Sequence, residues 1–327
     1  MRIVVLEDWN HLFAGAPALK RLAGRAEIEV QHDRPADVDD LVARLRAANV
    51  VVLNRERTRL DAETIARLPS LELIVQTGGI GSNVDVAAAS AHGVAVASAP
   101  GLPTSIEGVA ELALGLLIAL ARRIPEHDRH VRAGHWNVAP TTMLHGGTMG
   151  IVGLGRLGRS LARIGPALGM RVIAAGVTLT PARAAESGAE WVTLDDLFPQ
   201  ADAVFICPRL TPETRGLVTR RHLASMRPTA YLINVARGPI VDEAALIEAL
   251  RERWIAGAGL DVFDVEPLPV DHPFTQLDNV ILTPHIGWVT AENTARFVES
   301  VVERITSYLD GDRSGIVNPE ALASRRN

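Results

Sequence analysis

The 327-residue sequence is short of several residue types, and each shortage excludes a class of protein. Its single cysteine, Cys207, excludes an internal disulfide framework and fits a reducing compartment. Lys20 is its only lysine, and a net charge of −5 without a basic cluster argues against a nucleic-acid partner. The longest uncharged apolar stretch, residues 112–121, is too short to span a membrane. We therefore expect a cytoplasmic protein with no membrane partner.

What the chain does contain is short apolar runs that alternate with helical patterns. Four runs in the first hundred residues favour strands: RIVVLE, NVVVLN, LELIVQTG and VAVASA. A second block adds six more: GTMGIVGLG, MRVIAAG, DAVFIC, AYLINVA, IAGAGLDV and NVILTP. This alternation predicts the α/β class, with two doubly wound parallel sheets covered by helices on both faces. A hydrophobic content of 47% is enough for two domain cores.

The best break between the domains is SAPGLP, at residues 98–103. The segment 104–123 is apolar nearly all round and favours a long buried helix. A last helix, at about 290–310, follows the second block, and we expect it to return to the first domain. The prediction is a flavodoxin-like substrate domain (1–98 and 288–327) with a Rossmann dinucleotide-binding domain (99–287) inserted into it.

A glycine-rich loop follows the first strand of the second block, in IVGLGRLGRSLARIG. Gly153 permits a tight turn, Gly155 lets the backbone approach a pyrophosphate, and Gly158 lets helix and strand pack closely. The alternative is a plain strand-to-helix turn, because GxGxxG alone is a weak signal. The strand–turn–helix context favours dinucleotide binding.

The next strand ends without the acid that usually binds the adenosine ribose in this fold. Gly176 stands there, followed by Val-Thr-Leu at 177–179, which offers no arginine for a 2′-phosphate. Thr180, before Pro181, is typical of a helix N-cap, and Arg183 lies one turn further on. We expect both NAD and NADP to be used, with weak discrimination between them.

Three polar residues follow later strands: Arg237, Glu266 and His285. A guanidinium can bind a carboxylate as a fork, a histidine can transfer a proton near neutral pH, and a carboxylate beside it would orient it. Each residue alone could be a surface arginine, a turn glutamate or a satisfied strand-end histidine. Because ligands of open α/β sheets lie beyond the carboxyl ends of the strands, the three together favour a site.

The motifs GIVGLGRLGRSLA, TPETRGLV, MRPTAYLINVARGPIVDEAALIEAL, GLDVFDVEP and NVILTPHIG resemble the D-isomer-specific 2-hydroxyacid dehydrogenases over nearly the whole chain. The resemblance implies an oxidoreductase that transfers a hydride between NAD(P)H and C2 of a small 2-keto or 2-hydroxy acid. By position, Arg237 would bind the substrate carboxylate and carbonyl, His285 would be the general acid/base, and Glu266 its partner.

The same resemblance assigns the remaining contacts. Asp261 would hold the nicotinamide carboxamide, and Arg156 with Leu157 would meet the pyrophosphate. The full set of expected cofactor contacts is Gly153, Gly155, Arg156, Leu157, Gly158, Gly176, Cys207, Pro208, Val235, Ala236, Asp261 and Gly287. Gly79 and Ile80 match the loop whose backbone amides bind the substrate carboxylate in the family, often with glycine where Ile80 stands. Trp288 completes the expected substrate contacts. The resemblance also implies a homodimer packed partly through 104–123.

A different class of protein remains open, namely a dinucleotide-sensing binding protein like the corepressors built on this scaffold. It could keep all three polar residues, but the chain shows no low-complexity extension. Formate oxidation is disfavoured because that branch replaces the acidic partner of the histidine, and Glu266 is present.

Other conspicuous residues have simpler explanations. His127, His130 and His135 favour a solvated helix face rather than a metal site, so no metal is expected. Cys207 follows an apolar strand with no evident basic partner, which favours an inert thiol beside the cofactor. Trp9 and Trp288 are candidate pocket walls, with plain packing equally consistent.

Overall fold

The computed structural model describes residues 1–9, 11–136 and 139–322, which form two compact units. Unit 1 comprises Met1–Pro103 and Ala291–Asn327, and unit 2 comprises Thr104–Thr290. The predicted boundaries were 98/99 and 287/288, so the divisions lie a few residues further along the chain. The last helix belongs to unit 1, and unit 2 is inserted in its sequence.

Unit 1 is built on a five-stranded parallel sheet in the order β2-β1-β3-β4-β5. Its strands are β1 (Arg2–Val5), β2 (Glu27–Val30), β3 (Val50–Leu53), β4 (Leu73–Thr77) and β5 (Ala95–Ala99). Its helices are α1 (Val38–Leu45), α2 (Ala62–Ala66), α3 (Val86–Ala91) and α11 (Ala291–Leu309), with the 3-10 turns η1 (Pro17–Leu22) and η5 (Pro319–Leu322). This strand order is flavodoxin-like, as predicted.

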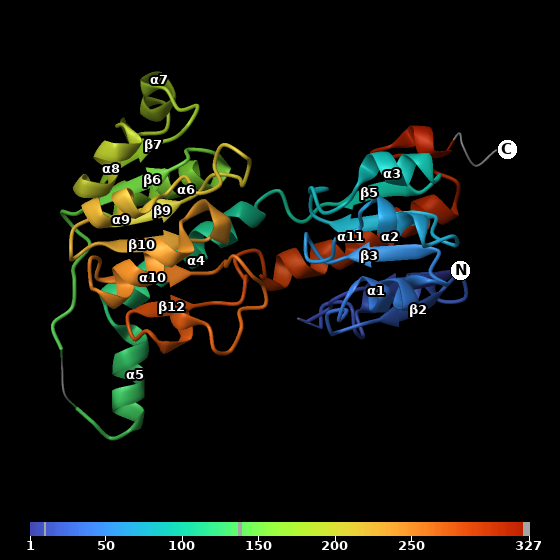
Figure 1. Cartoon of the computed structure of the whole chain (residues 1–327), viewed down its shortest axis with the longest axis horizontal. Helices are drawn as coiled ribbons and strands as arrows, with labels where there is room; N and C mark the ends of the chain where they lie inside the picture. Colours follow the sequence, from blue (N-terminus) through green and yellow to red (C-terminus); the bar gives the residue numbers. More distant parts are fainter. Residues whose placement is uncertain (10, 137–138, 323–327) are drawn as a thin grey trace. The chain divides into compact units, whose positions relative to one another are not determined.

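Apolar side chains leave both faces of this sheet, because successive residues of a strand point to opposite sides. Val5 and Val52 pack with α11 and η1 on one face, whereas Val4 and Val51 pack with α1, α2 and α3 on the other. Figure 1 shows α11, drawn in red, beside the blue and cyan strands of this unit. The sequence prediction missed β2, whose four residues are only half-buried or exposed at the sheet edge.

Unit 2 is built on a seven-stranded parallel sheet in the order β12-β11-β10-β9-β6-β7-β8. Its strands are β6 (Thr148–Val152), β7 (Arg171–Ala175), β8 (Glu190–Trp191), β9 (Ala203–Ile206), β10 (Tyr231–Asn234), β11 (Gly257–Leu260) and β12 (Val280–Leu282). Its helices are α4 (Ser105–Ala121), α5 (Ile124–Arg132), α6 (Arg156–Ile164), α7 (Pro181–Ala185), α8 (Leu194–Gln200), α9 (Arg220–Ser225) and α10 (Glu243–Arg251), with η2 (Gly165–Leu168), η3 (Gly238–Ile240) and η4 (Pro273–Gln276).

From one edge, the sheet runs β8-β7-β6-β9-β10-β11, which is the Rossmann order. Strand β12 is added at the other edge (Figure 1). All six strands predicted in this block are present, and only the two-residue, exposed β8 was missed. The long helix expected at 104–123 is α4, which buries Leu116, Leu117 and Leu120. Asp242 caps α10 by accepting a hydrogen bond from the amide of Ala245 at 3.0 Å.

Candidate active site

The order in which strands are added to the sheet of unit 2 reverses between β6 and β9: β7 and β8 lie on one side of β6, and β9 and the later strands lie on the other. In open α/β sheets a ligand binds beyond the carboxyl ends of the strands at this switch point. Gly153 follows β6 there, and Cys207 follows β9, its amide donating to the carbonyl of Val152 at 2.9 Å. The glycine loop therefore lies where the topology places a ligand.

The geometry of this loop fits a dinucleotide. Gly153 has φ +88°, and a Cβ on it would lie 2.8 Å from the nitrogen of Pro208. A Cβ on Gly158 would clash with the carbonyl oxygen of Gly153, so helix α6 packs directly on the turn. Gly155, the N-cap of α6, is exposed, and a Cβ on it would meet no atom within 4 Å. Two glycines are therefore needed for the fold, while the third leaves open space at a helix N-terminus suited to phosphate.

The residues flanking this loop differ in what they can offer. Arg156 is exposed at the first turn of α6, while the side chain of Leu157 is 6% exposed and packs in the core. Leu157 can therefore meet a pyrophosphate only through its backbone. Burial raises the pKa of the Cys207 thiol, which agrees with an unreactive side chain. Val235 and Ala236, after β10, are also buried.

The loop after β7 is a tight turn, with the Leu179 amide donating to the Gly176 carbonyl at 3.1 Å. Arg183 reaches back from α7 and donates to the carbonyl of Thr178 at 2.9 Å. Thr180 caps α7 as predicted, accepting from the Arg183 amide at 3.4 Å. A Cβ on Gly176 would lie 3.4 Å from Leu179 Cβ and 3.6 Å from the backbone of Gly153, which are ordinary contacts, so a Cβ fits there.

His285 and Glu266, which lie 19 positions apart in sequence, are brought into contact at the carboxyl edge of the same sheet. His285 Nδ1 lies 2.7 Å from Glu266 Oε2, and the Phe263 amide donates to Glu266 Oε1 at 3.0 Å. Burial alone would raise the pKa of Glu266, but the hydrogen bond and charge of His285, with the charge of Arg237, lower it. Glu266 is thus an ionised partner that holds the imidazole in place.

Asp261 fixes the loop that carries His285. It is 1% exposed, and its two oxygens accept from Thr283 Oγ1 at 2.6 Å and from the amides of Ile286 and Gly287 at 2.8 and 2.9 Å. His285 itself has φ +55°, a left-handed conformation that such bonds hold in place. The sequence reasoning missed Thr283, although a hydroxyl two residues before the histidine was a usable signal.

Arg237 follows β10 and is half-buried. Asn234, buried at the end of β10, donates to the carbonyl of Arg237 at 3.0 Å and accepts from the Ala236 amide at 3.1 Å. The following residue, Gly238, has no room for a Cβ against the backbone of Phe263. This local frame fixes the backbone of the arginine beside the Glu266 loop, and Asn234 is a second positioning residue that the sequence prediction did not name.

In unit 1 the predicted substrate loop follows β4. Gly79 is exposed, and the side chain of Ile80 packs against the apolar cluster that includes Leu60 and Val84. The branched side chain at position 80 therefore anchors the loop. The carbonyl of Gly79 accepts from Gln76 Nε2 at 2.7 Å. These contacts give the loop a defined shape, which the sequence alone left uncertain.

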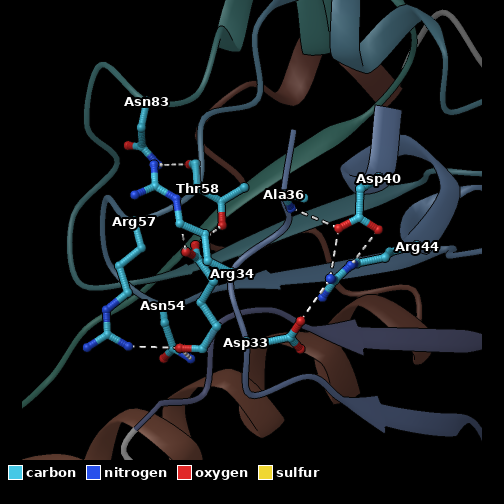
Figure 2. Close-up of polar contacts among 10 residues, drawn as sticks. Asp33, Arg34, Ala36, Asp40, Arg44, Asn54, Arg57, Thr58 and Asn83 are labelled. Atoms are coloured by element: carbon cyan, nitrogen blue, oxygen red, sulfur yellow. Dashed lines mark hydrogen bonds and ion pairs between the residues drawn. The ribbon is translucent and has the colours of Figure 1, made fainter. Parts of the chain in front are cut away.

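The neighbouring strand ends of unit 1 carry a buried polar cluster, shown in Figure 2. Glu7 follows β1, is 1% exposed, and accepts a hydrogen bond from Thr58 Oγ1. Arg57 donates to the Glu7 carbonyl at 2.8 Å and lies over the Trp9 ring, 4.2 Å from its centroid. Burial raises the pKa of Glu7 despite Thr58, Arg34 and Arg57, each of which lowers it. The Trp9 ring therefore packs against the Arg57 guanidinium in a cation–π contact.

The other predicted residues are placed as follows. Trp288 is buried, with 7% of its surface exposed. His127, His130 and His135 stack edge to face along α5 and its exit, with ring centroids 6.4 and 6.3 Å apart. Within residues 1–9, 11–136 and 139–322, the acidic, cysteine and histidine side chains form no cluster suited to a metal ion. No helix among these residues is both long and apolar enough to cross a membrane.

Taken together, unit 2 offers an open helix N-terminus behind a glycine turn, a histidine held by an ionised glutamate, and an arginine beside them. This set can bind an anionic dinucleotide, move one proton and hold a carboxylate. It lacks the acid after β7 that would favour an unphosphorylated ribose.

Comparison with known proteins gives consistent matches. Residues 114–287 match the family described as D-isomer specific 2-hydroxyacid dehydrogenase, NAD binding domain. A glyoxylate reductase of Korarchaeum cryptofilum is 40% identical over 273 residues, covering 81% of this chain and 82% of the relative. A D-3-phosphoglycerate dehydrogenase of Mycobacterium bovis is 39% identical over 304 residues, covering 90% of this chain and 57% of that longer protein. The crystal structure of a phosphoglycerate oxidoreductase from Vibrio cholerae superposes with a TM-score of 0.88 at 31% identity, covering 95% and 99% of the two chains.

Proposed function

The chain belongs to the D-isomer specific 2-hydroxyacid dehydrogenases, and we propose that it reduces a small 2-keto acid, or oxidises the matching D-2-hydroxy acid, with NAD(P)(H). The observation that carries the proposal is the 2.7 Å contact between His285 Nδ1 and Glu266 Oε2 in the unit that holds the glycine loop. A dinucleotide-sensing protein on this scaffold could keep the same pair, so turnover of a 2-keto acid is what separates the two functions.

The nicotinamide, when bound, supplies or accepts the hydride. His285 manages the proton, because reduction of a carbonyl leaves an oxygen that must be protonated. Glu266 occupies Nδ1, which leaves Nε2 as the nitrogen that donates to the substrate oxygen at C2 and takes the proton back in oxidation. Asp261 contributes by accepting hydrogen bonds from the amides of Ile286 and Gly287, which fixes the backbone after His285. We assign it the additional contact to the nicotinamide carboxamide.

Substrate binding is assigned to Arg237 in unit 2 and to the amides of Gly79 and Ile80 in unit 1. Arg237 presents a planar fork that matches a carboxylate, and backbone amides bind the same group without a charge of their own. Trp288 is assigned as a further substrate contact. The relatives include reductases of glyoxylate and dehydrogenases of phosphoglycerate, so the class is a small 2-oxo acid.

For the cofactor we propose weak discrimination between NAD and NADP. Gly176 presents no carboxylate to a ribose 2′-hydroxyl and none to repel a 2′-phosphate. The Arg183 guanidinium is held at the same turn by its hydrogen bond to the carbonyl of Thr178. Among the described residues 176–185, it is the one positive charge.

For the assembly we propose a homodimer. Helix α4 buries Ala110, Leu117 and other residues against its own unit, while Glu111 and Gly115 on its opposite side are exposed. Light scattering at micromolar concentration should give the mass of two chains, and a stable monomer would contradict the proposal.

One assay tests the activity. Oxidation of NADH and of NADPH is followed with a panel of 2-keto acids and with uncharged ketones of the same size. We expect turnover of at least one acid with both cofactors and poor turnover of the ketones. Tight NADH binding without turnover of any acid would instead favour the dinucleotide-sensing alternative.

A further inference from the structure

Two successive carbonyls at the start of the predicted substrate loop, those of Gly78 and Gly79, accept hydrogen bonds from side chains of the unit 1 sheet. Ser98 Oγ, in β5, donates to the carbonyl of Gly78 at 2.6 Å, and Gln76 Nε2, in β4, donates to the carbonyl of Gly79 at 2.7 Å. Gly78 has φ +83°, which turns the chain sharply between these two bonds. Two consecutive peptide groups are therefore held in defined orientations.

The orientation of the carbonyls fixes the orientation of the amides. In a trans peptide the N–H points opposite to the C=O of the same plane. The amide of Gly79 therefore points away from Ser98, and the amide of Ile80 points away from Gln76. Within the described parts of the chain, neither amide donates a hydrogen bond. Two such successive amides are the usual composition of a backbone anion site.

The donor end of Gln76 is set by a chain of amides anchored on backbone carbonyls. The carbonyl of Thr58 can only accept, so Asn83 presents Nδ2 to it at 3.0 Å. Asn83 Nδ2 also donates to Gln76 Oε1 at 3.0 Å, which leaves Nε2 of Gln76 for the carbonyl of Gly79. Figure 2 shows Asn83 beside Thr58. Gln76 is fully buried, so water does not compete for these bonds.

We propose that Gln76 and Ser98 are positioning residues that aim the amides of Gly79 and Ile80 at the substrate carboxylate. Ile80 completes the arrangement, because its side chain is packed on the apolar cluster behind β4 and resists rotation of the loop. This inference rests on the proposed function. It adds that binding of the acid depends on two uncharged side chains that do not touch it.

The test replaces the donor of Gln76 without removing side-chain volume, and it removes or keeps the hydroxyl of Ser98. In Gln76→Glu the carboxylate still accepts from Asn83 but repels the Gly79 carbonyl and attracts the Ile80 amide inward. We expect KM for the best 2-keto acid to rise roughly 10- to 100-fold, the range for a hydrogen bond to a charged group, with little change in kcat. Gln76→Met removes the donor without adding charge and should raise KM in the same direction. Ser98→Ala should raise KM by less, and Ser98→Thr, which keeps the hydroxyl, should restore it.

A matched control separates positioning from general loss of stability. Asn318 is 1% exposed in unit 1 and donates to the Val94 carbonyl and to Ser90 Oγ, at the opposite ends of the strands. Asn318→Asp therefore removes the same kind of buried amide elsewhere and should leave KM unchanged. Binding of NADH, followed by its fluorescence, should be the same in all these variants.

Calorimetric titration of oxamate, a carboxylate analogue of small 2-keto acids, into each protein with saturating NADH gives the second readout. Its dissociation constant should follow KM across the series. Equal losses in Asn318→Asp and Gln76→Glu, or wild-type KM and oxamate affinity in both Gln76 variants, would overturn the inference. A wild type that reduces no 2-keto acid would overturn the proposed function instead, and the oxamate series would still decide the role of Gln76.

Discussion

Two glutamates, one buried and one half-buried, lie beyond the carboxyl ends of strands, one in each unit, and their pKa values move in opposite directions. Burial disfavours the charged form of both. For Glu266 the hydrogen bond and charge of His285 outweigh burial, and its pKa is lowered. For Glu7 the bond from Thr58 and the charges of Arg34 and Arg57 do not suffice, and its pKa is raised. Glu266 is therefore held as a carboxylate at the edge of its sheet, whereas Glu7 is shifted towards the neutral acid.

Under the proposed function, the two edges would handle a ligand differently. The edge of unit 2 uses side chains whose chemistry cannot be exchanged, namely an imidazole, its carboxylate partner and a guanidinium. The edge of unit 1 uses amides and hydroxyls, such as Gln76, Asn83 and Ser98, to orient its own backbone. Substitutions in unit 2 should therefore affect the chemical step, while those in unit 1 should affect binding.

The largest effect is expected at His285. His285→Ala removes the proton donor and should lower kcat by roughly 10²- to 10⁴-fold while NADH binding survives. The chain offers a matched control, since His272 Nε2 pairs with Glu243 Oε1 at 3.2 Å in the same unit. His272→Ala should leave kcat near wild type. Turnover is measured at saturating cofactor, and an unchanged kcat in His285→Ala would refute the assignment.

The second effect is expected at Arg237. Arg237→Lys keeps the charge and loses the planar fork, so kcat/KM for 2-keto acids should fall roughly 10- to 100-fold, as for loss of a hydrogen bond to a charged group. Arg253, an exposed arginine paired with Asp278, provides the control variant Arg253→Lys. Equal turnover of acids and uncharged ketones by the wild type would contradict a carboxylate-binding role.

The glycine loop gives a third effect, on cofactor binding alone. Gly155→Ala adds a methyl group in open space, so the protein should fold normally, and the methyl should crowd the pyrophosphate. Affinity for NADH should fall by about 5-fold or more, the lower range of an overpacking penalty. Position 153 has φ +88°, and a Cβ there would lie too close to Pro208. Gly153→Ala should therefore also lower the thermal midpoint. Fluorescence titration and thermal unfolding separate the two outcomes.

Much of this architecture could be predicted, because buried strands and the turn and helix segments between them are strong signals in sequence. The predicted strands are all present, and the missed ones, β2 and β8, are edge strands with exposed side chains. The glycine loop and the three polar residues of unit 2 were predictable because their roles require particular residue types. Their local geometry agrees with those roles at the contact of His285 with Glu266.

The edge of unit 1 was harder to predict. The role proposed for Gly79 and Ile80 uses backbone amides, which every residue except proline has, so their residue types indicate little. Gln76 lies inside an apolar strand and bonds the chain three residues on, a contact that depends on the turn at Gly78. Glu7 gave no signal either, since nothing in the sequence indicates that Thr58, from a different strand end, donates to it.

A fourth and smaller effect concerns a carboxylate that unit 2 lacks. A Cβ at position 176 makes ordinary contacts with Leu179, and Gly176→Asp should penalise NADP by placing a negative charge beside the 2′-phosphate. We expect kcat/KM for the two cofactors in the wild type to differ by roughly 5- to 30-fold at most, or about 1–2 kcal/mol, and the variant to shift the ratio towards NAD. Gly176→Ala, which fills the space without charge, should leave the ratio nearly unchanged. A wild-type preference beyond roughly a thousandfold would show that other residues select the cofactor.

The smallest effect returns to the two glutamates and tests the comparison directly. The folded pKa of Glu7 is raised, so as pH rises from the ordinary glutamate value through the folded one, the unfolded chain ionises first and stability is lost. The folded pKa of Glu266 is lowered, so its contribution is present above the ordinary value and is lost as pH falls through the folded one. In Glu7→Gln and Glu266→Gln these contributions vanish. The free energy of unfolding, wild type minus variant, should therefore decrease with rising pH for Glu7 and increase for Glu266. Urea unfolding between about pH 3 and pH 8, which extends well below and well above the ordinary glutamate pKa, measures both slopes. Slopes of the same sign would show that the direction of the pKa shift is wrong for one of the two glutamates.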